Sequence, residues 1–280
     1  MNTAHKFSGK RVLITGSGTG IGREIALEFA RQGADVVVHY AHDAKGARSA
    51  VEEIRAMGRR SEAFAANFDR VEEAVKLGDQ AVEFLGGIDC LVNNSGITFN
   101  RPFPEVTPEQ FDRLYHVNVR APYFLTQNIA RNMLTHGGGA VCNITSIHGI
   151  SGAPEHSVYA GTKGAIIAQT RALAVELAHQ GIRVNAIAPG WVTVENYYKA
   201  IPGFNEADAR KDAAGKVPLG RSGTKLEIAK LAAFLCSDDA AFIVGQTVVA
   251  DGGTTSLMSL ISDFRNRSSA SFGKGYVPGV

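Results

Sequence analysis

The sequence predicts an α/β protein with a single doubly wound parallel sheet and helices on both faces. Short apolar runs alternate with longer segments of helical periodicity along most of the 280 residues. The apolar runs are continuous in Val, Ile and Leu instead of alternating with polar residues, which is typical of parallel strands covered on both faces. Because crossovers between parallel strands are right-handed, a doubly wound sheet is the leading architecture.

Seven apolar runs are predicted to be strands. The first is rich in β-branched residues and is followed by glycines, the third is the weakest, and the sixth ends at Pro189 and Gly190. In chain order, the predicted strands span residues 11–15, 36–38, 62–68, 88–92, 140–144, 182–187 and 247–250.

Six longer segments between these runs have helical periodicity. In the first, Ile21, Ile25 and Phe29 recur every four residues, and in the second a glycine, Gly58, follows the last helical residue. The fourth opens at Thr107, with acidic and amide residues in its first turn. The predicted helices span residues 21–31, 44–57, 72–84, 107–133, 158–178 and 225–235.

The chain is expected to form one domain, because no linker rich in Pro or Ser divides it. We assign residues 1–256 to this domain and residues 257–280 to a C-terminal extension. Residues 194–217 are polar and irregular, fall outside the alternation of strands and helices, and are expected to form a substrate loop.

Composition excludes several classes of protein. With 45% hydrophobic and 20% charged residues the chain is not disordered, and a formal net charge of +2 indicates neither a nucleic acid nor a membrane as partner. The first nine residues form no secretory signal, and Cys90, Cys142 and Cys236 are far apart and without ligand-spaced neighbours. We therefore expect a cytoplasmic protein with free thiols and no bound metal.

Glycines make up 31 of the 280 residues, about 11%, which exceeds the ~7% that is usual. Several of them fall between the first predicted strand and the first predicted helix. Gly16, Gly18, Gly20 and Gly22 would let the backbone turn tightly and approach a ligand, and the following helix offers free N–H groups to a pyrophosphate. No Lys-Ser or Lys-Thr pair follows, which disfavours a P-loop. The segment predicts a dinucleotide site.

Four polar residues are candidates for chemistry. Tyr159 and Lys163 are one helical turn apart, where an ammonium would lower the pKa of a phenol and make it a general acid or base. Ser146 ends a strand at the edge where open sheets bind ligands, and Asn118 falls inside a predicted helix, where it could hold a water or bend the helix. Each also has a plainer explanation, as a surface contact, a turn residue or a solvent-facing amide.

Six motifs occur in order along the chain: Thr15, Gly16, Gly20 and Gly22; Asn93, Asn94, Ser95 and Gly96; Asn118; Ser146; Tyr159 and Lys163; Pro189 and Gly190. In this order and spacing they resemble the short-chain dehydrogenase/reductase family, over about residues 8–253. The resemblance implies a Rossmann fold, a nicotinamide cofactor, and hydride transfer between an alcohol and a carbonyl.

The resemblance also implies roles for individual residues. Tyr159 would be the proton donor or acceptor, Lys163 would lower its pKa and bind the ribose, Ser146 would orient the carbonyl, and Asn118 would position a water in a proton relay. The implied cofactor contacts are Gly16, Ser17, Thr19 and Ile21 for the pyrophosphate, Asn67 and Phe68 for the adenine, Asn94 and Gly96 for the ribose, and Pro189, Gly190 and Val192 for the nicotinamide. Val194 stands where the family often has a phosphate-binding Thr.

The cofactor is expected to be NADP more than NAD. Members that select NAD usually have an acid at the end of the second strand, and here that position is Tyr40. The cations available for a 2′-phosphate are His39, His42 and Lys45.

The substrate is expected to be a sugar or polyol. Ser146-Ile147-His148 resembles the Ser-x-His of glucose dehydrogenases in this family, and polar groups at His148, Glu155, His156 and Asn196, together with Trp191, cluster near the expected pocket. The alternatives are a 3-oxoacyl thioester reductase and, in another class, a non-catalytic dinucleotide-binding regulator. The resemblance implies a homotetramer, and the tail from residue 257 could border a neighbouring subunit's pocket.

Overall fold

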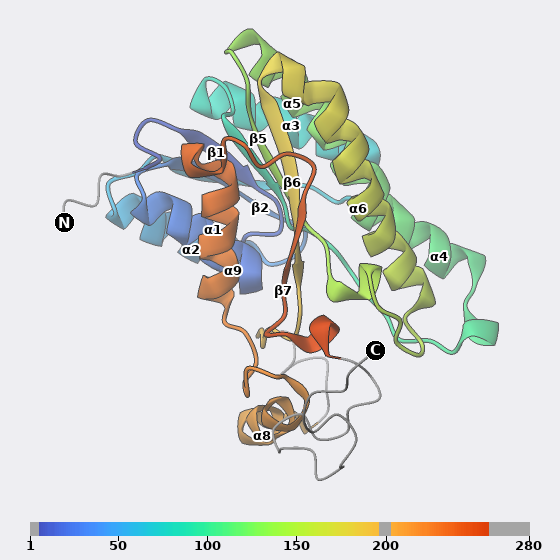
Figure 1. The fold of residues 1–280 in the computed structure, drawn as a ribbon. Helices are drawn as coiled ribbons and strands as arrows, with labels where there is room; N and C mark the ends of the chain where they lie inside the picture. The colour runs from blue at the N-terminus through green and yellow to red at the C-terminus, as the bar shows by residue number, and fades with distance from the viewer. Residues whose placement is uncertain (1–5, 196–202, 258–280) are drawn as a thin grey trace, which may run out of the picture.

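The computed structural model describes residues 6–195 and 203–257, which form one seven-stranded sheet with the strand order β3-β2-β1-β4-β5-β6-β7 (Figure 1). Every neighbouring pair is parallel, so the doubly wound sheet predicted from the sequence is confirmed. Asn196 and most of the C-terminal extension lie outside the described residues. The strands are β1 (Arg11–Ile14), β2 (Asp35–Tyr40), β3 (Ser61–Ala65), β4 (Cys90–Asn93), β5 (Gly139–Ile144), β6 (Ile182–Pro189) and β7 (Thr247–Ala250).

Helices cover both faces of this sheet (Figure 1). On one face lie α1 (Gly20–Arg31), α2 (Ala44–Ala56) and α9 (Lys225–Cys236). On the other lie α3 (Val71–Leu85), α5 (Ala121–Thr135) and α6 (Ser157–Leu177), with α4 (Pro108–Tyr115) leading into α5. No helix in the described part of the chain is long and apolar enough to cross a membrane.

Two hydrophobic cores, one on each face, explain why the strands have no polar alternation. In β1, Val12 and Ile14 belong to the core beneath α1, α2 and α9, and Leu13 between them belongs to the core beneath α3, α5 and α6. All three are fully buried, so each side chain of the strand gains stability from burial. The three cysteines are buried free thiols, as expected.

Two segments differ from the sequence-based expectation. Residues 194–217 were expected to be irregular, but α8 (Glu206–Lys216) forms there, capped by Asn205, whose side chain accepts from two backbone N–H groups. Only Ala213 of this helix is buried, so its sequence carries no apolar period that would have indicated a helix.

The predicted helix 107–133 is continuous but not uniform. Between α4 and α5 the residues His116–Arg120 form a π-helical turn. Such a turn accommodates one extra residue in an α-helix. It places Asn118 where its side chain bonds the backbone of Ile97, and these bonds offset the irregular helix geometry.

Candidate active site

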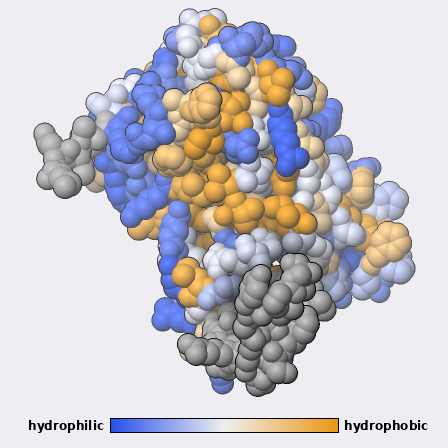
Figure 2. Space-filling view, in the orientation of Figure 1, coloured by the Kyte–Doolittle hydropathy of each residue, from blue (hydrophilic) through white to orange (hydrophobic). Residues whose placement is uncertain are grey.

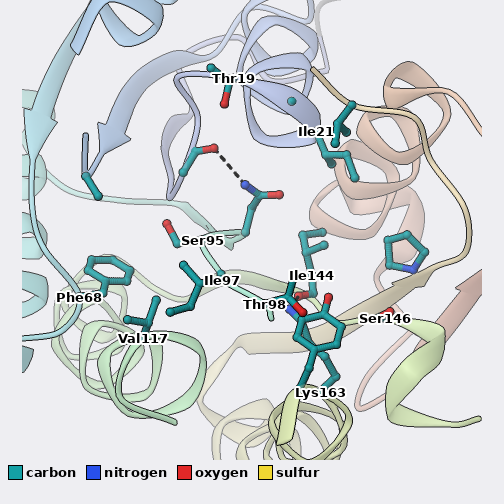
Figure 3. Close-up of a pocket in the computed structure, with 18 of the residues that line it drawn as sticks. Thr19, Ile21, Phe68, Ser95, Ile97, Thr98, Val117, Ile144, Ser146 and Lys163 are labelled. Carbon is teal, nitrogen blue, oxygen red and sulfur yellow. Dashed lines mark hydrogen bonds between the residues drawn. The ribbon is translucent and has the colours of Figure 1, made fainter. Parts of the chain in front are cut away.

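A cavity of about 1590 Å³ opens at the carboxyl ends of the strands, where open parallel sheets bind ligands (Figure 3). It is lined by the turns after β1 and β2, by the loops after β3, β4, β5 and β6, and by the first turns of α6. Among residues 6–195 and 203–257, no group of three or more His, Cys, Asp or Glu side chains is placed to hold a metal ion.

The glycine turn after β1 is held by the loop after β4. The backbone N–H groups of Asn94 and Ser95 both donate to Thr15 Oγ1 at 3.0 Å, and Asn94 Nδ2 donates to the carbonyl oxygens of Thr15 and Gly16. Gly16 has a φ of 63°, which favours glycine. A Cβ at Gly22 would lie 2.3 Å from the Gly16 carbonyl oxygen, so helix and turn meet too closely for any side chain.

The N-terminus of α1 faces the cavity and has the carboxylate of Glu195, which pairs with Lys225, nearby. Burial acts to raise the pKa of Glu195, but hydrogen bonds from Lys225 and from backbone N–H groups hold it below its ordinary value. Thr19 makes no side-chain cap, so the first N–H groups of the helix face the cavity, and they fit a pyrophosphate.

His39 corrects an expectation from the sequence, which treated it as a cation for a 2′-phosphate. Its side chain lies inside the protein, where burial lowers its pKa to about 4, although its hydrogen bond to the Ala66 carbonyl acts to raise it. A neutral imidazole has no charge to offer a phosphate near pH 7. His42 and Lys45 are exposed and can still serve as cations.

Ser146 and Lys163 line the cavity (Figure 3), and Tyr159 lines it as well. Lys163 Nζ lies 5.5 Å from the centre of the Tyr159 ring and donates to the Ile144 carbonyl oxygen at 3.0 Å. Burial lowers the pKa of Lys163 to about 8, so the ammonium still predominates at neutral pH. Ser146 follows β5 by two residues, and its Oγ accepts from the backbone N–H of His148 at 3.2 Å.

Asn118 does not line the main cavity. Its Oδ1 accepts from the Ile97 N–H at 2.8 Å, and its Nδ2 donates to the Ile97 carbonyl oxygen and to Thr162 Oγ1. A methyl group at Gly96 would lie 3.3 Å from Asn118 Oδ1 and 3.6 Å from Lys163 Nζ. Asn118 and Lys163 therefore lie on the same side of Gly96, and the second lone pair of Oδ1 is available to a water.

The other predicted cofactor residues surround the cavity, with one exception. Ser17 is fully buried, and its Oγ donates to the Ile14 carbonyl oxygen at 2.7 Å, so it shapes the turn from behind. The cavity is lined by Gly16, Thr19, Ile21, His39, Tyr40, Asn67, Phe68, Asn94, Gly96, Pro189, Gly190 and Val192. Val194 also lines it and offers only a hydrocarbon surface.

The predicted substrate residues divide into two groups. His148 and Trp191 line the cavity, as does His156, whose ring lies 4.7 Å from that of His148. Glu155 is exposed, lies outside the cavity lining and has a φ of 64°, so the structure does not bring its side chain to the site. Phe204 lines the cavity, but its sequence surroundings gave no sign of this.

His148 contacts the candidate catalytic residue and has an unused polar atom. Its ring lies 5.6 Å from the ring of Tyr159, and its Nδ1 is buried without a hydrogen-bond partner. Burial, with a smaller contribution from His156, lowers the pKa of His148. A neutral imidazole in this place can donate to or accept from a substrate hydroxyl.

The chain matches known proteins over most of its length. Residues 16–255 match a family model described as "Enoyl-(Acyl carrier protein) reductase". The chain is 38% identical over 260 residues to the hydroxynaphthalene reductase-like protein Arp2 of Metarhizium robertsii, covering 90% of this chain and 97% of that protein.

Two solved structures extend the likeness to three dimensions. One is a 7α-hydroxysteroid dehydrogenase complexed with NADH and 7-oxo glycochenodeoxycholic acid, with a TM-score of 0.84, 34% identity and coverage of 90% of this chain and 97% of the other. The other is a short chain dehydrogenase from Burkholderia cenocepacia in complex with NADP, with a TM-score of 0.82, 32% identity and coverage of 89% and 99%. The chain therefore belongs to the short-chain dehydrogenase/reductase family and is an NAD(P)-dependent oxidoreductase.

Proposed function

We propose that this enzyme interconverts a secondary alcohol and a ketone on a substrate that carries further hydroxyl groups, with NADP(H) as the preferred cofactor. The observation that supports the substrate class is the unpartnered, buried Nδ1 of His148 beside Tyr159. A buried polar atom without a partner is costly, and a substrate hydroxyl would remove that cost. Membership in a family of oxidoreductases argues against a non-catalytic regulator.

The reaction uses three side chains of the cavity. In the direction of reduction, Tyr159 Oη donates a proton to the substrate oxygen, and Ser146 Oγ donates a hydrogen bond to the same atom. The ammonium of Lys163 stabilises the phenolate that Tyr159 becomes. The dinucleotide, when bound, supplies or accepts the hydride.

Asn118 would return the proton through a water. A second cavity of about 20 Å³ is lined by Asn93, Asn118 and Asn143, among others, which is room for about one water with polar partners. Asn93 Oδ1 is buried without a partner and lines this cavity. A water there would satisfy it and would lie beside Asn118.

The dinucleotide would run across the cavity from β2 to β6. We assign the pyrophosphate to Gly16, Thr19 and Ile21, the adenine to Asn67 and Phe68, the ribose to Asn94, Gly96 and Lys163, and the nicotinamide to Pro189, Gly190 and Val192. The first N–H groups of α1, which no side chain caps, support the pyrophosphate assignment.

The residues at the end of β2 support a preference for NADP. Tyr40 lines the cavity where an acid would bind the 2′-hydroxyl of NAD, and exposed His42 and Lys45 follow it. Replacing Tyr40→Asp would set a carboxylate against the 2′-phosphate. We expect it to lower kcat/KM for NADPH by about 10²-fold and to raise that for NADH.

Steady-state kinetics with both cofactors, on wild type and Tyr40→Asp, measure this effect. Met57→Asp, at an exposed position just after α2, is the matched control and should leave the cofactor ratio unchanged. A wild-type preference for NADH, unaltered by Tyr40→Asp, would contradict the NADP assignment.

Two substrate classes fit the histidine pair. Sugars and polyols carry hydroxyls next to the reacting carbon, and the Ser-x-His pattern supports them. Hydroxylated aromatic ketones do so as well, and the name of the Metarhizium relative supports them. In both, His148 and His156 would bind a second hydroxyl while Trp191 packs against the ring.

His148→Leu separates hydroxyl recognition from catalysis. It is expected to raise KM for a hydroxylated ketone by about 10- to 100-fold and to leave turnover of a cyclic ketone without hydroxyls nearly unchanged. His136→Leu, at an exposed position beyond α5, controls for loss of a histidine. The panel should hold sugars, polyols, hydroxynaphthalenones and 3-oxoacyl thioesters, and turnover of the thioesters alone would overturn the proposal.

A homotetramer remains our proposal for the assembly. Figure 2 shows hydrophobic residues gathered on the face that carries α9 and β7, where Phe234, Phe242 and Val249 are exposed. Tyr123 and Phe124 of α5 are also partly exposed. Exposed apolar surface of this kind is typical of subunit interfaces.

A further inference from the structure

We propose that His39 is a positioning residue for the dinucleotide. Its side chain holds the glycine turn after β1 at a fixed distance from the loop after β3. The inference rests on the cofactor part of the proposed function and is independent of the substrate. His39 does not need to touch the cofactor, because it acts through the backbone of both loops.

The side chain of His39 joins three loops of the cavity. Its Nδ1 accepts from the backbone N–H of Gly16 at 2.9 Å, and its Nε2 lies 3.0 Å from the Ala66 carbonyl oxygen. Its ring stacks on Phe68, with centroids 4.6 Å apart and planes 11° apart. Ser95 Oγ, from the loop after β4, lies 3.2 Å from Nδ1.

The backbone of His39 adds two bonds to the same turn. Ser17 N–H donates to the His39 carbonyl oxygen at 2.9 Å, and His39 N–H donates to Ser17 Oγ at 3.1 Å. These bonds hold the backbone of His39 against the glycine turn. Its ring then links that turn to the backbone of Ala66.

Only one form of the imidazole fits these partners. Because the Gly16 N–H can only donate, Nδ1 must be an acceptor, and the proton is on Nε2, which donates to Ala66. An imidazolium would set an N–H against the N–H of Gly16. The groups that face the ring, Gly16, Ala66, Phe68 and Ser95, are all uncharged, and burial lowers the pKa of His39 to about 4.

In the proposed cofactor site, these loops bind two neighbouring parts of the dinucleotide, the pyrophosphate and the adenine. Gly16 lines the pyrophosphate end, and Asn67 and Phe68 line the adenine end, directly after Ala66. A bridge of one rigid ring keeps the two ends at a fixed separation, so the cofactor does not have to order them on binding. Loss of the bridge should weaken dinucleotide affinity and leave proton and hydride transfer intact.

Three variants test the bridge in the full-length protein. His39→Leu removes both polar atoms and the stacking, His39→Phe keeps a ring on Phe68 without polar atoms, and His39→Asn keeps an acceptor near the place of Nδ1. Fluorescence titration with NADPH should give a Kd about 10- to 30-fold above wild type for Leu and Phe, and about threefold above for Asn. The kcat at saturating NADPH should stay within about threefold, and His136→Asn should match wild type.

Unfolding of the cofactor-free protein supplies a second readout. Between pH 6.5 and 4 the unfolded chain binds a proton at His39 that the folded protein does not, so wild-type stability should fall as the pH falls. For each unit that the pH falls in this range, the ratio of the wild-type unfolding equilibrium constant to that of His39→Asn should rise about tenfold.

The outcomes separate the two hypotheses. Wild-type binding of NADPH, with Leu and Phe variants binding within threefold of it, would overturn the role of His39 alone. Binding of neither NADPH nor NADH by wild type would overturn the proposed function, and the role of His39 with it. Should His39→Leu not fold, His39→Phe carries the same expectation.

Discussion

Tyr159→Phe is expected to lower kcat by at least about 10³-fold while the Kd for NADPH stays within about threefold of wild type. The substitution removes one oxygen and keeps the ring, which packs 5.6 Å from His148 and 5.5 Å from Lys163 Nζ. Because the proposed proton donor is that oxygen, chemistry should fail while binding persists. Steady-state kinetics and fluorescence titration with NADPH measure the two effects separately.

The matched control for this variant is Tyr115→Phe. Tyr115 is the last residue of α4 and lines neither cavity, so loss of its hydroxyl should leave kcat unchanged. If Tyr159→Phe kept more than about a tenth of wild-type kcat, another group would have to transfer the proton, and His148 would be the first to examine.

Lys163→Met is expected to have opposite effects on activity and on stability. It removes the charge that favours the phenolate of Tyr159 and a proposed ribose contact, so kcat/KM should fall by about 10³-fold. It also removes a charge from the protein interior, where only 4% of Lys163 is exposed. The variant should therefore unfold at higher denaturant concentration than wild type at pH 7.

The sign of the stability effect follows from the pKa. Burial lowers the pKa of Lys163 from 10.5 to about 8, so below pH 8 the folded protein holds a charge that the unfolded chain accommodates more easily. Removing it should raise the free energy of unfolding by about 1–3 kcal/mol, after loss of the bond to Ile144. As the pH rises from 8 to 10.5, wild type loses this proton and the advantage of the variant disappears.

Urea denaturation at pH 7 and pH 9.5 measures this difference. Lys230→Met on the exposed face of α9 is the control for replacing a lysine by methionine, and it should show no such dependence on pH. A Lys163→Met variant that is less stable than wild type at pH 7 would mean that the buried ammonium stabilises the fold.

Local sequence was sufficient to predict the sheet and most of its helices. Strands buried on both faces leave a continuous apolar run, as at residues 11–14, and amphipathic helices leave a period of about four, as in α1. The residues of α8 leave neither, because its stability comes from a capping Asn205 and from tertiary context.

The motifs located the cavity, but they could not determine which side chains reach it. Tyr159 and Lys163 share a helix face, and their positions follow from helix geometry alone. The direction of Glu155 depends on a left-handed backbone conformation within a loop, and the charge of His39 depends on burial. The direction of the Glu155 side chain and the charge of His39 both depend on contacts between loops that are distant in the sequence. No local sequence pattern predicts such contacts.

The π-helical turn at His116–Arg120 also decides how this long helix would tolerate a change in its length. Because the turn accommodates one extra residue, loss of one residue from it would close the helix into regular α geometry and keep α4 and α5 in their present register. The cost would fall on Asn118, whose bonds to Ile97 depend on the turn. A deletion within α5 has no such turn to absorb it, so it would rotate the residues beyond it by about 100° and turn the buried Ile129 and Met133 away from the sheet.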